Sequence, residues 1–189
     1  MANLRSKCDR AVIAFISDAA KGVNAAVNLY PCFYSGERDQ SNGLIDVVTS
    51  QGLEDPPFSG NHWMDVKIRI QSAAINQPSE SDKLAARAFI GEMADAVFDV
   101  LHQTDNNSDY QYTARAISAV GNGLTADRSG GTDQNEIQRA KDDADMAAFS
   151  CLDIRGVHYL GAPDEGEKSL SFVEVMKFQM YAAASGGLN

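Results

Sequence analysis

Three histidines are one group of residues in this chain whose type suits metal binding. His62, His102 and His158 lie far apart, and none has another ligand type three or four residues away. A zinc site needs three or four nitrogen or sulfur ligands that converge on one point. We therefore interpret the three histidines as residues of the surface or of the edge of the core.

The aspartates of the segment KDDAD, residues 141–145, are the second metal candidate, because carboxylate oxygens can hold magnesium or calcium. Asp142, Asp143 and Asp145 supply the oxygens, but the glycine and the terminal glutamate of a calcium-binding loop are absent. A solvated helix end accounts for the same residues. We predict no cofactor, and a small metal-dependent hydrolase stays an alternative function.

The sequence contains no recognisable motif for nucleophilic catalysis or for phosphate binding. The segment GNG at 121–123 lacks the third glycine of a dinucleotide loop and the lysine of a phosphate loop, and no G-x-S-x-G motif occurs. Cys8, Cys32 and Cys151 are odd in number and widely spaced, which favours buried free thiols over a disulfide framework. We find no catalytic constellation and do not predict an enzyme.

The composition is that of an ordinary globular protein with a strong acidic excess. The formal net charge is −10 over 189 residues. This charge argues against a protein that grips phosphates, but it suits one that nucleic acid must slide past. No apolar run approaches the roughly 18–20 residues of a membrane span. The apolar run at 11–16 is a poor signal-peptide core, so we expect synthesis in the cytoplasm and no membrane partner.

Hydrophobic spacing predicts two long helices that must position any site. Residues 3–21 repeat apolar side chains every three or four positions. The clearest helix lies within residues 76–103, where Ser79 or Ser81 can cap the start and the acids that follow suit the helix dipole. Its apolar stripe is formed by Phe89, Met93, Val97 and Leu101, with Ile90 and Phe98 beside them.

Alternating side chains predict the strands. The segment 60–74 sends Val66, Ile68 and Ile70 to one face and Asp65, Lys67 and Arg69 to the other. Further strands are predicted at 44–50, 110–122, 146–161 and 169–183, the last two forming a hairpin. In the last strand, Val173 and Val175 lie opposite Met176, so either a bulge shifts the register or both faces are covered.

These elements predict one α+β domain over residues 1–189. Its sheet is expected to be mainly antiparallel, with the helices packed on one face. Residues at about 121–145 are polar and glycine-rich, and we expect a long flexible loop with a short helix near 134–143.

The order of segments resembles a known family. The run G-x-x-x-x-x-V-x-I-x-I from Gly60 to Ile70 precedes a helix with Arg87 near its start, and two long strands close the chain. This pattern resembles the neck and tail-completion proteins of long-tailed bacteriophages, in particular the tail-terminator group. The chain departs from that group in its long polar loop at about 121–145.

The resemblance implies a structural virion protein of the phage tail and neck. Such proteins form a ring, commonly a hexamer, at the head-proximal end of the tail tube, where they end tube growth. The ring joins the tail to the head connector or a head-completion protein, and DNA passes through its lumen without specific binding. Another neck component, such as a head-completion or minor tail protein, is the alternative within this class.

Three groups of residues are candidates for contacts in such a ring. Asp65, Lys67 and Arg69 supply paired contacts to a neighbouring subunit or face solvent. Phe58 and Trp63, in and beside a proline-bearing loop, are a candidate docking site for a partner, although core packing also explains Trp63. Acids without interleaved bases form either a negative lumen or rim or a solvated helix face, and they are Glu92, Asp95, Asp99, Asp105 and Asp109.

Overall fold

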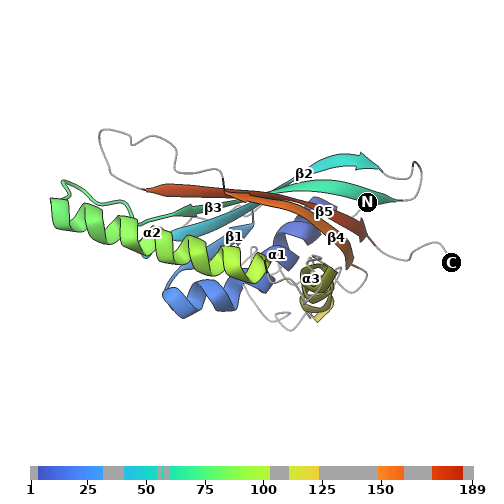
Figure 1. Ribbon diagram of the computed structural model, residues 1–189, viewed down its shortest axis with the longest axis horizontal. Coiled ribbons are helices and arrows are strands. Elements are labelled where there is room, and N and C mark those ends of the chain that lie inside the picture. Colours follow the sequence, from blue (N-terminus) through green and yellow to red (C-terminus); the bar gives the residue numbers. More distant parts are fainter. Residues whose placement is uncertain are drawn as a thin grey trace, which may run out of the picture.

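The computed structural model describes residues 4–31, 41–54, 57, 60–102, 111–123, 149–159 and 172–184. Within these residues the chain forms three helices and five strands (Figure 1). The helices are α1 (Leu4–Val23), α2 (Glu80–Leu101) and α3 (Gln111–Gly123). The strands are β1 (Asn28–Pro31), β2 (Leu44–Glu54), β3 (Asn61–Gln71), β4 (Phe149–Tyr159) and β5 (Val173–Ala184).

The five strands form one sheet in the order β1-β2-β3-β5-β4. β1 and β2 are parallel, whereas β2 with β3, β3 with β5, and β5 with β4 are antiparallel. The predicted α+β class and mainly antiparallel sheet are therefore confirmed. In the view of Figure 1, α1, α2 and α3 lie below the sheet.

The inner face of the sheet forms the core. β3 buries Met64, Val66, Ile68 and Ile70 at alternate positions, as its sequence predicts. The facing residues of β5 and the apolar sides of the helices complete the core cluster, for example Met176, Phe178, Met180, Ile16, Met93, Val97 and Ile117. Each large side chain removed from water contributes about 1.5–3 kcal/mol. A shift of β3 by one residue would expose all four of its buried side chains, so burial fixes the register.

Helix α1 confirms the amphipathic pattern predicted for residues 3–21. Cys8, Val12 and Ile16 are fully buried. The hydroxyl of Thr49 on β2 donates a hydrogen bond of 2.5 Å to the Asp9 carboxylate, and both side chains are buried. This polar contact fixes α1 against the sheet. No helix in the described ranges is both long and apolar enough to cross a membrane.

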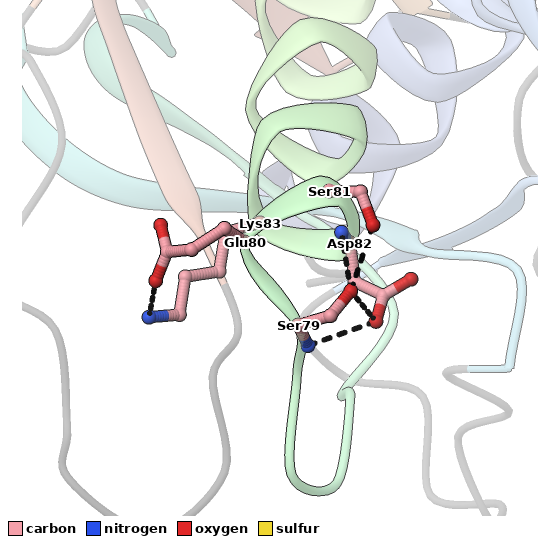
Figure 2. Close-up of polar contacts among 5 residues, drawn as sticks. All are labelled: Ser79, Glu80, Ser81, Asp82 and Lys83. Atoms are coloured by element: carbon pink, nitrogen blue, oxygen red, sulfur yellow. Dashed lines mark hydrogen bonds and ion pairs between the residues drawn. The ribbon is translucent and has the colours of Figure 1, made fainter.

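The start of α2 shows which serine caps it (Figure 2). The Ser79 hydroxyl accepts a hydrogen bond from the Asp82 backbone N–H at 3.2 Å, and the Asp82 carboxylate accepts one from the Ser79 backbone N–H at 2.9 Å. This reciprocal pair is a capping box, which satisfies two backbone donors that the helix itself leaves open. Ser79 is therefore the N-cap, and Lys83 with Glu80 adds an ion pair of 2.7 Å on the first turn.

Residues 110–122 were predicted to be a strand, and this prediction is wrong. They form most of α3, whose buried residues are Thr113, Ala114, Ile117 and Gly121. Spacings of one, three and four residues place these side chains on one side of a helix. The Ser118 hydroxyl donates to the Cys151 carbonyl at 2.8 Å and accepts from its backbone N–H. α3 thus satisfies both backbone groups of Cys151 on β4.

The two C-terminal strands are confirmed, and the open question about β5 is resolved. β5 pairs with β3 from Val173 to Ala183 without a shift in register, so β5 has no bulge there. Val175 and Met176 point to opposite faces and both are buried, so both faces are covered at these two positions, whereas Val173 is half-buried. The irregular pairing lies on β4, where Gly156 adopts a positive φ of 58° that glycine tolerates.

Several predictions concern residues outside the described ranges. They include Cys32, the short helix near 134–143 and the aspartates at 142, 143 and 145. The predicted loop at 121–145 begins too early, because residues 121–123 form the last turn of α3.

Candidate functional site

The residues of β3 that alternate with its buried side chains lie on the other, outer face of the sheet. Asp65 and Lys67 are exposed there, and Arg69 is half-buried, as the alternation predicts. Although they come from one strand, the structure does not give the three side chains a common role. Arg69 is bound within the subunit, whereas Asp65 and Lys67 line a hollow.

Arg69 forms an ion pair within the subunit. Its guanidinium donates two hydrogen bonds to the carboxylate of Asp46, the residue directly opposite on β2. Asp46 is only 2% exposed, so the pair places a buried carboxylate beside an opposite charge. Arg69 is therefore bound within the subunit, whereas the sequence had suggested a contact to a neighbouring subunit or exposure to solvent.

The hollow lies on the outer face across β2, β3, β5 and β4 and has a volume of about 520 Å³. Its charged and titratable side chains are Asp65, Lys67, Arg155, His158 and Lys177. Arg155, His158 and Lys177 were not identified from the sequence. The sequence shows that these residues alternate with apolar ones. It does not show that they lie beside Lys67, because that depends on the pairing of β3 with β5, more than a hundred residues apart.

Two lysines face each other at the centre of this hollow. Lys67 on β3 pairs directly with Lys177 on β5, and both side chains are exposed. Side chains in such positions have Cβ atoms about 4.5–5.5 Å apart, and like charges there destabilise a sheet. No described residue forms a salt bridge with either lysine. The nearest acid along β3, Asp65, instead accepts a hydrogen bond of 3.0 Å from Gln179.

Trp63 lies on the outer face at the edge of this region. Its ring stacks on Tyr181 of β5, with centroids 5.0 Å apart, and the Arg155 guanidinium lies 4.0 Å from its centroid. Arg155 also bonds Asp153 at 3.2 Å. Trp63 is half-buried and outside the core, which excludes core packing as its role. Its predicted companion Phe58 lies outside the described ranges.

The acidic candidates on α2 are exposed. Glu92, Asp95 and Asp99 lie three and four residues apart and therefore on one side of the helix. The buried residues of α2, which include Met93 and Val97, lie on its core side. The structure thus brings three of the five predicted acids together, and Asp105 and Asp109 lie outside the described ranges.

A further carboxylate lies near this acidic side. Burial and the neighbouring Asp95 charge raise the pKa of Glu174 on β5 above its ordinary value. One carboxylate oxygen of Glu174, Oε2, is buried and has no hydrogen-bond partner among the described residues. The Asp95 charge on α2 is therefore repelled by Glu174 on the sheet.

Metal binding and thiol chemistry have no support in the described ranges. No three His, Cys, Asp or Glu side chains there lie close enough to share a metal ion. Cys8 and Cys151 are buried free thiols, as predicted. Burial raises the pKa of the Cys151 thiol to about 12 and that of Cys8 well above its ordinary value, so neither forms a thiolate readily.

Comparisons with known proteins yield no relative. The chain matches no family model, and a search of curated proteins found no significant match.

Proposed function

We propose that this chain is a structural protein of a long-tailed bacteriophage, a tail terminator that forms a ring at the head-proximal end of the tail tube. The observation that carries the proposal is the outer face of the sheet, with its exposed hollow and with Lys67 and Lys177, which form no salt bridge with a described residue. The ring ends tube growth and joins the tail to the head connector or a head-completion protein.

The cost of the lysine pair supports a contact surface. Two like charges directly opposite each other weaken the sheet by a fraction of a kcal/mol, and no described acid forms a salt bridge with either of them. A partner surface of opposite charge would remove this repulsion on binding. If this surface only faced solvent, the repulsion between the two lysines would have no benefit, and substitution of either lysine would remove it.

The fold suits a ring subunit. A closed ring needs a heterologous interface, in which one surface of a subunit meets a different surface of its neighbour. The outer face of the sheet and the exposed side of α2 are two such surfaces, and they differ in charge. We expect a hexamer, the common ring size among tail terminators.

The charge of the chain suits a passage for DNA. A net charge of −10 repels phosphates, so a lumen formed by this chain would let DNA pass without holding it. The protein would act in the virion neck after synthesis in the host cytoplasm. The resemblance of the Gly60–Ile70 run and of the segment order to tail terminators points in the same direction.

The test is negative-stain imaging, with light scattering across a concentration series, of the protein alone and mixed with tail tubes. We expect rings with a central hole, or caps at one end of the tubes. Caps without free rings would mean that the tube templates assembly and would still support the proposal. A monomer that ignores tubes would refute it and leave another neck component as the better assignment.

A further inference from the structure

We infer that the hollow on the outer face of the sheet binds the acidic side of α2 from a neighbouring copy of this chain. This inference rests on the proposed ring, and it names the two surfaces that meet. The hollow is defined here by Lys67, Lys177, Arg155 and His158, and the acidic side of α2 by Glu92, Asp95 and Asp99.

The hollow favours an acidic partner. Lys67 and Lys177 have no ion-pair partner among the described residues, and Arg155 adds a third positive charge that Asp153 partly offsets. The one acid in the lining, Asp65, bonds Gln179. The hollow is therefore positive in a chain whose net charge is −10.

A protein surface fits this hollow better than a nucleic acid does. Proteins that hold a phosphate backbone use many basic contacts along an extended face. Here Lys67 and Lys177 lie in one hollow of about 520 Å³ beside Asp65, and Val48 at its edge is 37% exposed. A small basic site with an apolar margin suits a few carboxylates on a folded element.

The acidic side of α2 has the complementary properties. Glu92, Asp95 and Asp99 are exposed, and none has an ion-pair partner in the described part of the chain. Seven residues of helix span about 10 Å, so the three carboxylates form a short, rigid row. Glu174 on β5 lies near this row and its charge and that of Asp95 repel each other.

A subunit cannot join these two surfaces itself. The apolar side of α2 packs into the core with the inner faces of β3 and β5, whereas the hollow opens on the outer face. Figure 1 shows α2 below the sheet. The acids of one copy can therefore reach only the hollow of another copy. Such a contact joins two different surfaces, which is the kind of interface that closes a ring.

Charge reversal tests this pairing. The first variant carries Lys67→Glu and Lys177→Glu, and the second carries Glu92→Lys and Asp99→Lys, which spares Asp95 because it lies near Glu174. We expect each variant to assemble at least about tenfold more weakly than the wild type, measured by light scattering or by tube capping. The combined variant should regain assembly with itself and should not enter wild-type rings.

Matched controls come from α1. Lys21→Glu and Asp18→Lys reverse the same types of charge at exposed positions, and both should assemble as the wild type does. Circular dichroism and thermal unfolding check that every variant folds. Rising salt should weaken wild-type assembly, because exposed charges are screened. If a charge-reversed variant does not fold, the salt dependence of wild-type assembly tests the inference instead.

The outcomes separate this inference from the proposed function. If the wild type forms rings or caps tubes while either reversed variant does so equally well, the inference fails and the proposed function stands. Failure of the combined variant to regain assembly, or wild-type assembly that salt does not weaken, also overturns it. Loss of oligonucleotide binding in the lysine variant with unchanged assembly would assign the hollow to nucleic acid. A wild type that neither assembles nor caps tubes refutes both.

Discussion

Replacement of Gly121 by alanine tests the packing of α3, the helix that the sequence did not predict. A Cβ atom at this position would lie 2.8 Å from Cδ1 of Phe149 and 3.1 Å from Cβ of Ala11. Carbon atoms in contact prefer about 3.5–4.0 Å. Phe149 is 1% exposed and Ala11 is fully buried, so neither can move aside into solvent.

The expected magnitude follows from two opposing effects. Overpacking of a core costs about 1–3 kcal/mol, whereas alanine is favoured over glycine by at most about 0.5–1 kcal/mol, the value for a helix interior, because Gly121 lies in the last turn of α3. We therefore expect Gly121→Ala to lower the free energy of unfolding by roughly 0.5–2 kcal/mol. The assay is urea unfolding, with the slope compared between variants to confirm that only stability has changed.

Gly91 provides the matched control. It lies inside α2, and an added Cβ there meets no atom within 4 Å. Gly91→Ala should therefore stabilise the protein by about 0.4–1 kcal/mol. Both variants replace a helical glycine, so opposite effects on stability would report the contacts with Phe149 and Ala11. Equal stabilisation by both would refute the packing of α3 between β4 and α1.

Two further predictions concern charged side chains. Arg69→Met should cost about 1–3 kcal/mol in chemical denaturation, because buried Asp46 loses a charged hydrogen-bond partner. Lys67→Met should change stability by no more than about 0.5 kcal/mol, and equal losses in the two variants would contradict the roles assigned to them. The raised pKa of Glu174 means that the folded state binds more protons than the unfolded state, so stability falls as pH rises above the ordinary glutamate pKa of 4.5. Glu174→Gln should therefore unfold at a higher temperature than the wild type at pH 7, and this advantage should vanish at lower pH. A pH-independent gain, or the same gain from exposed Glu92→Gln, would show that burial of the Glu174 charge is not the cause.

Periodic patterns in the sequence predicted the elements that carry the core. The alternation of Val66, Ile68 and Ile70 located β3, and the apolar stripe through Met93 and Val97 located α2. Both patterns arise because one face of the element must be buried along its whole length. The same alternation assigns Trp63 to the outer face, since it shares the parity of Asp65, but its aromatic character suggested the core as an alternative.

α3 was missed because its buried side is small. Ala114 and Gly121 supply little hydrophobic signal, and the tyrosines at the start of the segment favour a strand. The spacing of Ala114, Ile117 and Gly121 nevertheless matches a helix, and Gly121 permits the close approach to Phe149. Tertiary packing therefore decided the structure of this segment where local propensity was ambiguous.

The candidate site was only partly predictable. The alternation of β3 identified Lys67 as outward-facing, but it did not show that Lys177 lies directly opposite or that Asp46 binds Arg69. These relations depend on the pairing of strands that are far apart in the chain. Residues that share a strand face can thus have different roles, because their partners on adjacent strands differ.

Arrest of tube growth is the most direct test of the central claim, that this chain ends a tail tube as a ring. A phage tail tube protein would be polymerised and this protein added during growth. Tube mass would be followed by light scattering, with images of the products. We predict that growth stops and that a ring is seen at one end of each tube. Unchanged growth, with no additional density at either end, would contradict the claim.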